Sequence, residues 1–212
     1  MQDKFLNGIL GQQSKLEALR ALAPEGAELT GREIARRTGL SHPIVHKALR
    51  DLVAEGIVAR KDVPPSHQFR LNRNHWVVAE IICPMFEKES GWMEHLARSV
   101  ARGIPKPVVS VILYGSAVKG GMTPRSDIDV LFLVSSMQQK KRIEDWVFDC
   151  GRRVYEAFGH PLAPVILTLT EFRKEHERGR EFAKEIGYAG RVIHGKLLTE
   201  VLFEHGSQED QL

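Results

Sequence analysis

The sequence predicts a protein of the α/β (α+β) class, with a small helical domain followed by a mixed sheet flanked by helices. Two observations support this prediction. In residues 1–73, segments with apolar residues at helical spacing lead into a pair of alternating strands. From residue 107 onward, short apolar runs alternate with helical segments, which is typical of a sheet covered by helices.

The first third of the chain carries signals for three helices and a hairpin. Leucines at helical spacing predict a first helix from Ser14, as its cap, to Leu22. The spacing of Thr30 and Glu33 predicts a capping box, in which the two residues exchange hydrogen bonds between side chain and backbone amide. A short helix over residues 34–38 should follow it.

A third helix is predicted after Ser41, which should cap it, and ends at Gly56. The next residues alternate as two strands, 57–62 and 67–71, around a Pro-rich turn. The second and third helices should therefore be joined tightly at Gly39 and lie directly before the hairpin.

This arrangement resembles the winged helix-turn-helix domain of bacterial regulators. The resemblance rests on Thr30-Gly-Arg-Glu-Ile-Ala-Arg-Arg-Thr-Gly-Leu-Ser41, Val45-His-Lys-Ala-Leu49 and Leu52-Val-Ala-Glu-Gly-Ile57. It implies double-stranded DNA as the partner, with the outer N-terminal face of the third helix in the major groove and the hairpin at phosphates or the minor groove. Docking of a protein partner is the alternative. The side chains expected at the DNA are His42, Pro43, His46, Lys47 and Arg50 of the helix, and Arg60, Lys61, His67 and Gln68 of the hairpin.

Composition and charge agree with a globular protein that contacts nucleic acid. The chain has 212 residues, of which 42% are hydrophobic and 27% charged. Residues 1–73 contain 12 Lys and Arg and 8 Asp and Glu, a net charge of +4, whereas the remainder carries −1. A positive excess confined to one domain is compatible with DNA binding.

Residues 74–106 are predicted to form a helical linker with breaks at Pro84 and at Ser90-Gly91. Its many aromatic and aliphatic side chains need a surface to pack against. Two interpretations remain open: packing on one of the domains, or a homodimer through residues 75–104. The domain prediction is therefore 1–73, 74–106, 107–205 and a polar tail, 206–212.

Two carboxylates stand at the start of an apolar run in the second domain. The run 108–114 reads as a buried strand, and a Gly- and Pro-rich segment separates it from a second strand, 130–134. Asp127 and Asp129 precede that second run. Alternate residues of a strand share a face, so both carboxylates should point the same way. Paired carboxylates suit Mg²⁺ or Mn²⁺, which take oxygen ligands and share them with phosphates.

Gly115 and Ser116 end the first strand and complete a motif. A glycine lets backbone approach a phosphate closely, and the serine adds a hydroxyl donor. Gly-Ser, ten intervening residues and Asp-x-Asp resemble the polymerase-beta-like nucleotidyltransferase superfamily, in particular its minimal members. The resemblance implies that Asp127 and Asp129 are catalytic metal ligands. It also implies that Gly115, Ser116 and Lys119 bind an NTP such as ATP.

The elements after this motif complete the predicted sheet. A helix over residues 139–159 precedes a third strand, 164–169, and a helical segment, 171–185, precedes a short last strand, 191–194. The segment Phe182-Ala-Lys-Glu-Ile-Gly-Tyr-Ala-Gly-Arg-Val-Ile-His-Gly195 is similar to the end of minimal nucleotidyltransferase domains.

The third strand lacks a carboxylate that active members of that superfamily carry there. Glu171, just beyond the strand, is a candidate substitute. Because Thr168 is the polar residue of its strand face, that face is expected to border the site, and Ile166→Asp should then supply the missing acid. Without it, the nucleotide-bound metal should persist, while the metal that activates the acceptor is weakened.

Three functions follow from these features. The first is a Mg-dependent enzyme that transfers a nucleoside monophosphate to a hydroxyl acceptor. The second is a transcriptional regulator whose degenerate nucleotidyltransferase domain senses a nucleotide. The third is an antitoxin-like module with a toxin as partner. The intact motif favours the first, and the missing carboxylate together with the DNA-binding resemblance favours the second.

The location is predicted from three further features. Cys83 and Cys150 have no metal-ligand spacing and are expected to be reduced thiols. Residues 1–8 show no signal-peptide pattern, and the longest apolar-rich run, 76–86, is too short to cross a bilayer. We expect a cytoplasmic protein without a membrane partner.

Overall fold

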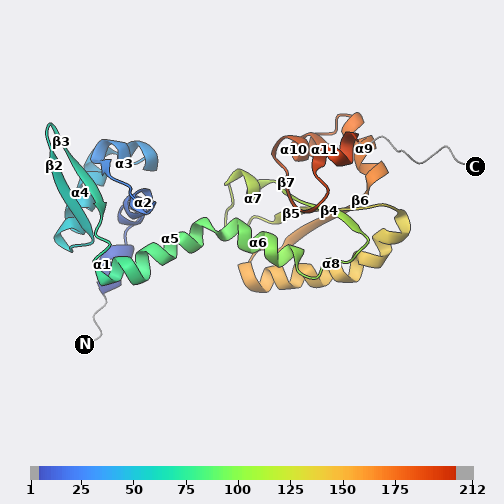
Figure 1. The fold of residues 1–212 in the computed structure, drawn as a ribbon, viewed down its shortest axis with the longest axis horizontal. Helices are drawn as coiled ribbons and strands as arrows, with labels where there is room; N and C mark the ends of the chain where they lie inside the picture. The colour runs from blue at the N-terminus through green and yellow to red at the C-terminus, as the bar shows by residue number, and fades with distance from the viewer. Residues whose placement is uncertain (1–4, 204–212) are drawn as a thin grey trace, which may run out of the picture. The chain divides into compact units, whose positions relative to one another are not determined.

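A computed structural model describes residues 5–203 and divides the chain into two compact units, 1–91 and 92–212. The predicted polar tail, residues 206–212, lies outside the described residues. Each unit has its own hydrophobic core. Figure 1 shows the helices and strands of both units. Among residues 5–203, no helix has both the length and the apolar character that crossing a bilayer requires.

The first unit combines helices with a small antiparallel sheet of order β1-β3-β2. The hairpin β2–β3 was predicted, whereas β1 was not, because two residues are too few to show a strand pattern. The helix α1 was also not predicted. The elements are α1 (Phe5–Leu10), α2 (Gln13–Leu22), β1 (Leu29–Thr30), α3 (Gly31–Thr38), α4 (His42–Ala54), β2 (Val58–Val63), β3 (Ser66–Leu71), the π-helical turn η1 (Val78–Ile82) and α5 (Cys83–Ser90).

Local capping signals fix the start of α3 but not of its neighbours. The Thr30 hydroxyl accepts a hydrogen bond from the Glu33 amide at 3.3 Å, and the Glu33 carboxylate accepts one from the Thr30 amide at 2.7 Å, so the predicted capping box is confirmed. Ser41 stands at the cap position of α4, but its side chain makes no capping hydrogen bond. The cap residue of α2 is Gln12 rather than Ser14.

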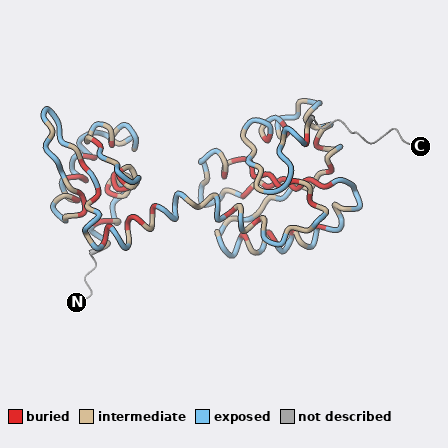
Figure 2. The backbone as a smooth tube through the Cα atoms, viewed as in Figure 1, coloured by how far each residue is buried: buried red, intermediate tan, exposed pale blue. Residues whose placement is uncertain are grey.

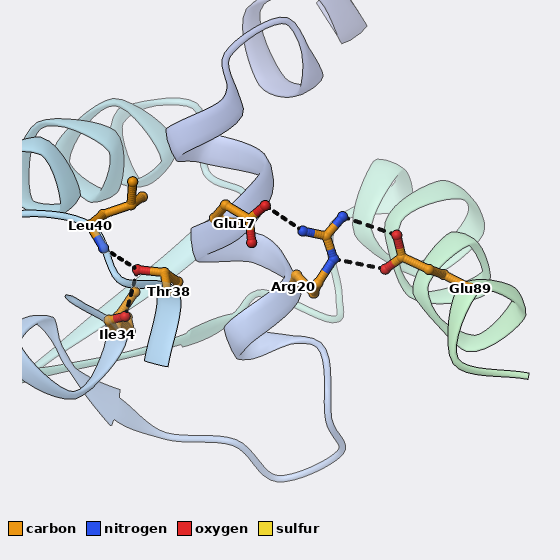
Figure 3. A network of polar contacts seen from close by, with 6 residues as sticks. All are labelled: Glu17, Arg20, Ile34, Thr38, Leu40 and Glu89. Carbon is orange, nitrogen blue, oxygen red and sulfur yellow. Dashed lines mark hydrogen bonds and ion pairs between the residues drawn. The ribbon is translucent and has the colours of Figure 1, made fainter. Parts of the chain in front are cut away.

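Polar contacts tie α2 to α5 within this unit (Figure 3). The Arg20 guanidinium donates to both carboxylate oxygens of Glu89, at 2.8 and 3.0 Å, and lies 2.7 Å from the Glu17 carboxylate. In the same unit, the Thr38 hydroxyl donates to the Ile34 carbonyl at 2.8 Å and closes the last turn of α3. The exposed ion pairs contribute little stability each, so the apolar core beneath them carries most of it.

The segment predicted as a separate linker is divided between the two units. Val78, Ile82 and Phe86 are buried in the core of the first unit, whereas Leu96 and Val100 are buried in the second. The predicted break at Gly91 is observed, but the helix does not break at Pro84. The π-helical turn η1 precedes this proline and accommodates its missing amide hydrogen bond.

The second unit is a mixed four-stranded sheet of order β6-β5-β4-β7. β4 pairs antiparallel with β5 and β7, and β5 pairs parallel with β6, so the sheet is mixed. The elements are α6 (Trp92–Ala101), β4 (Val108–Tyr114), α7 (Ser116–Lys119), β5 (Ile128–Val134), α8 (Met137–Phe158), β6 (Leu162–Thr168), α9 (Leu169–Glu177), α10 (Glu181–Ala189), β7 (Arg191–Gly195) and α11 (Leu198–Phe203).

Helices cover both faces of this sheet (Figure 1). Val130 and Phe132 face α6 and α8, whereas Leu131 and Leu133 face α9, α10 and α11. The buried stretches of Figure 2 concentrate in the two central strands, β4 and β5. The helical segment predicted over residues 171–185 is two helices, α9 and α10, because Gly179 has a left-handed backbone between them.

Thr168 offers a test of local stability in the second unit. Its buried hydroxyl accepts a hydrogen bond from the Glu171 amide at 3.1 Å, so Thr168→Ala should lower the free energy of unfolding by about 1 kcal/mol. The measurement is urea unfolding of the full chain. Thr170→Ala, an exposed threonine in the same helical turn, is the matched control and should have little effect. Equal stability of both variants would contradict the capping role.

The pH dependence of this cap has a defined sign. Backbone hydrogen bonding to Thr168 and the nearby Lys140 lower the pKa of Glu171 below its usual value. The contribution of the carboxylate is therefore full above the ordinary pKa of a glutamate and is lost as the pH falls through the lowered pKa. The stability difference between the wild type and Glu171→Gln should shrink below about pH 4.

Candidate functional site

The turn after β4 requires glycine for two reasons. Gly115 has φ 70° and ψ −150°, a conformation that side chains rarely adopt. A Cβ atom at this position would also lie 2.1 Å from Oδ2 of Asp129. The Asp129 carboxylate therefore lies directly against the Gly115 backbone. Ser116 and Lys119, two of the three predicted nucleotide ligands, begin and end the short helix α7 that follows.

Asp127 and Asp129 are held at the start of β5. Asp129 pairs with Tyr114 in the β4–β5 ladder, so its side chain lies on the sheet face that α10 covers. The Ser126 hydroxyl accepts a hydrogen bond from the Thr123 amide at 2.9 Å and fixes the turn before Asp127. Asp127 is exposed and Asp129 is half-buried, which leaves both carboxylates accessible to a ligand.

A third carboxylate near this pair, Glu185, was not predicted from the sequence. It lies on α10. The pKa of Asp129 is raised first by burial, then by the negative charge of Glu185, and then by that of Asp127. Burial and the charges of Asp129 and Glu185 likewise raise the pKa of Tyr114 to about 12. Glu185 accepts a hydrogen bond from Lys119 Nζ at 2.7 Å. No local motif marks Glu185, because a helix far along the chain brings it to the site.

Glu171, the candidate substitute, does not supply the missing acid of the third strand. Its carboxylate accepts hydrogen bonds from the Thr168 amide at 2.7 Å and from Lys140 at 3.0 Å, and so serves as a helix cap. Thr168 pairs with Val134 at one end of β5, whereas Asp129, at the other end, pairs with Ala163. The parallel register thus separates Glu171 from the carboxylate pair.

The expectation for Ile166 is wrong for a related reason. Ile166 pairs with Phe132 and packs into the core beneath α6 and α8, on the sheet face opposite Asp129. Ala163 is the β6 residue that lies beside Asp129 on its own face. An acid on this strand would therefore have to stand at residue 163, where the chain has a methyl group.

The donor set fits a magnesium ion bound together with a nucleotide. Among residues 5–203, no group of three or more His, Cys, Asp or Glu side chains is arranged to hold a metal. Mg²⁺ in nucleotide sites is held by one or two carboxylates together with substrate phosphates, rather than by a cage of protein ligands. Asp127, which is exposed, and Asp129, which is half-buried, could provide those carboxylates beside the turn of Gly115 and the half-exposed Ser116.

The first unit presents the predicted DNA-contacting side chains on its surface. His42, Pro43, His46, Lys47 and Arg50 are all exposed along α4, while Val45 and Leu49 anchor the opposite side of the helix in the core. The rings of His42 and His46 lie 6.2 Å apart. The structure thus brings the five helix residues to one face.

The hairpin residues are also exposed but are partly neutralised. Arg60 lies 3.2 Å from the Asp62 carboxylate, and Lys61 lies 4.0 Å from that of Glu28. His67 contacts Asp62 at 2.7 Å, and Gln68 is only half-exposed. These ion pairs are on the surface, where they are worth little and exchange readily for phosphate contacts.

Two further exposed features of the first unit were not among the predicted contacts. Ile44 is 47% exposed on α4 between the predicted contacts, and an apolar side chain there can meet a thymine methyl group. Arg32, Arg36 and Arg37 are exposed on α3 and add positive charge. Their signal was available, since the spacing of an amphipathic helix assigns these arginines to the solvent side.

The folds of the two units are those of a winged helix domain and of a nucleotidyltransferase domain. Comparison with protein families gives the same result: residues 8–68 match the MarR family and residues 94–192 match the nucleotidyltransferase domain. The chain is a fusion of a MarR-family winged helix domain and a nucleotidyltransferase domain. No curated protein matches the chain.

Similar solved structures are distant. One is described as the crystal structure of a toxin-antitoxin with AMP-PNP; it is 17% identical, with a TM-score of 0.33, and the match covers 52% of this chain and 79% of that one. Another is human N-acetylserotonin methyltransferase in complex with SAM, at 16% identity and a TM-score of 0.30, covering 49% and 34%. Scores this low establish neither a shared fold nor a shared function.

The close contact at Gly115 can be tested by adding one methyl group. Gly115→Ala should destabilise the second unit and displace Asp129, because the left-handed backbone is strained and the new Cβ would clash with the carboxylate. The measurement is the midpoint of thermal unfolding. Gly121→Ala is the matched control, since no atom lies within 4 Å of a Cβ there. A Gly115→Ala protein as stable as Gly121→Ala would contradict the described turn.

Proposed function

We propose that the second unit binds Mg-NTP at Asp127 and Asp129, and that the first unit binds double-stranded DNA. One observation supports the nucleotide site above all. The Asp129 carboxylate lies against the Gly115 turn, so that a candidate metal ligand is adjacent to the half-exposed Ser116 that follows the turn. Phosphates and their magnesium ion need this combination at one place.

Each residue of the site has a proposed role. Asp127 and Asp129 hold the ion, which would offset negative charge on the phosphates when bound. The Gly115 backbone and the Ser116 hydroxyl contact the triphosphate. Lys119 adds a positive charge once it leaves Glu185, and because this ion pair is exposed, its rupture costs little.

Transfer of a nucleoside monophosphate requires a further acidic group that the strands of this site do not contain. In the reaction, the acceptor hydroxyl oxygen forms a bond to the α-phosphorus, the bond from that phosphorus to the pyrophosphate oxygen breaks, and the hydroxyl proton must reach a base. The methyl group of Ala163 stands where a strand carboxylate would border Asp129. We therefore propose slow transfer, and a nucleotide-sensing regulator is the second candidate function.

Replacing acidic side chains at the nucleotide site should weaken or strengthen nucleotide binding, depending on which acid is replaced. Asp127→Asn/Asp129→Asn should abolish Mg-dependent ATP binding, because amides are weaker ligands for a hard cation. Glu185→Gln should instead tighten binding several-fold, because it frees Lys119 and removes negative charge near the phosphates. Calorimetry of the full chain with Mg-ATP measures both. Unchanged binding by the double variant would refute the site, and unchanged binding by Glu185→Gln would refute only its competition for Lys119.

The absent strand carboxylate gives a prediction about catalysis. Ala163→Asp should raise the rate of nucleoside monophosphate transfer, because residue 163 lies beside Asp129 on its sheet face. Ile166→Asp is the control on the opposite face, where a buried carboxylate should only destabilise the protein. Labelled NTP incubated with Mg²⁺ and cell extract reports the transfer. Fast transfer of the nucleoside monophosphate by the wild type would show that catalysis does not require a carboxylate on β6.

DNA binding should depend on salt through α4. Lys47→Ala/Arg50→Ala should weaken duplex binding, and each lost phosphate contact should reduce the slope of log affinity against log salt by about one. Lys88→Ala, an exposed lysine on α5, is the control and should leave the slope unchanged. Affinity measured by fluorescence anisotropy over a range of salt tests this. A full-length protein that ignores duplex DNA at low salt would identify the domain as a docking module.

A further inference from the structure

The helix α10 brings a carboxylate to the sheet face that carries Asp129. The Phe182 ring packs edge-on against the Tyr114 ring, with 5.3 Å between the centroids, and Tyr114 is the cross-strand partner of Asp129. Ile186 of the same helix is buried against the sheet, so the rotation of α10 about its axis is fixed. Glu185 follows Phe182 by three residues, and side chains at this spacing are neighbours on a helix surface. The helix therefore presents Glu185 near the end of β4.

The charge of Glu185 acts on the proposed metal ligands. After burial, it is the largest cause that raises the pKa of Asp129, ahead of the charge of Asp127. Interactions between charges weaken with distance and with screening by solvent, so Glu185 belongs to the same group of acids. Among residues 5–203 these three side chains do not form a cluster that could hold a metal ion, which leaves the Glu185 carboxylate for another task.

Lys119 holds one oxygen of Glu185 and leaves the other open. Lys119 Nζ donates to Oε1 at 2.7 Å, and no described residue donates a hydrogen bond to Oε2. Lys119 ends α7, the helix that Ser116 begins at the Gly115 turn, so a triphosphate at this turn would compete for the same ammonium group. Because the ion pair is exposed, the exchange costs little. Nucleotide binding would therefore free the whole Glu185 carboxylate.

The transfer reaction needs such a free carboxylate. When the acceptor oxygen bonds to the α-phosphorus, its proton must leave, and a carboxylate within hydrogen-bond reach is a suitable base. The β6 residue beside Asp129 is Ala163, whose methyl group cannot accept a proton. Since Asp127 and Asp129 are assigned to the metal ion, Glu185 is the acid of this group that remains for the proton.

We propose that Glu185 is the catalytic base of nucleoside monophosphate transfer, and that it becomes available when Lys119 moves to the triphosphate. This inference rests on the function proposed above for the second unit. The acceptor oxygen forms a bond to the α-phosphorus while its proton passes to the Glu185 carboxylate. The bond from that phosphorus to the bridging oxygen breaks, and pyrophosphate leaves with the electron pair. Glu185 then gives the proton to water and pairs with Lys119 again. A helix residue thus takes the place of the acid that β6 lacks.

Binding and transfer measured on the same full-length variants test this role. Glu185→Gln should bind Mg-ATP more tightly by calorimetry. At saturating Mg-ATP it should nevertheless transfer label from α-labelled ATP to acceptors in cell extract about a hundredfold more slowly, or slower still. Glu185→Asp keeps the carboxylate and should retain more of the rate than Glu185→Gln. Glu181→Gln, an exposed acid one turn earlier on α10, is the matched control and should change neither affinity nor rate.

The opposite shifts of affinity and rate separate a lost base from a damaged fold. A Glu185→Gln protein that binds Mg-ATP and transfers as fast as the wild type would overturn the proposal. A Glu185→Gln protein that loses binding and transfer together would also overturn it, because the side chain would then have a structural role. A wild type that binds Mg-ATP but transfers no label would overturn it as well, and would leave the nucleotide site intact. Failure of the nucleotide site itself is distinguishable, because Asp127→Asn/Asp129→Asn would then bind Mg-ATP as the wild type does.

Discussion

The contact between the Gly115 backbone and the Asp129 carboxylate is the constraint on which the proposed nucleotide site depends. Asp129 pairs with Tyr114, the residue before this glycine, so the ladder of β4 and β5 sets the distance between turn and acid. A side chain at residue 115 would fill the space that the carboxylate occupies. The buried strands β4 and β5 thus hold the Asp129 carboxylate and the Gly115 turn in place relative to each other. Burial also raises the pKa of Asp129, which makes a positive ligand at this position favourable.

Local signals in the sequence predicted the parts of this structure that depend on near neighbours. The capping box of Thr30 and Glu33, the turn at Gly115 and the strand before it each arise within a few residues, and each is present. Ala163 beside Asp129 could not be predicted, because the register of parallel strands is decided by packing between distant segments. Glu171 was considered as a substitute acid, although Thr168 and Glu171 have the same spacing as Thr30 and Glu33, and this local signal predicts the capping role that the structure shows.

The two units use charge in different ways. In the first, exposed cations gather on α3 and α4 around a small apolar core, which suits a polyanion without a fixed pocket. In the second, acids gather: Glu185 from α10 lies close enough to Asp129 to raise its pKa and also holds Lys119. An acidic site with one tethered lysine suits a ligand that brings both a cation and phosphates. Net charge alone, modest in both units, would not reveal either arrangement.

Asp127 and Asp129 are proposed to bind a metal ion together with a nucleotide at the Gly115 turn. The most direct measurement is a crystal structure of the full chain with Mn²⁺ and a non-hydrolysable ATP analogue, using the anomalous signal of manganese. Manganese should lie within about 2.0–2.3 Å of carboxylate oxygens from both aspartates, with phosphate oxygens completing its coordination beside Gly115 and Ser116. Manganese and nucleotide bound elsewhere, or nucleotide bound without either aspartate as a ligand, would contradict it.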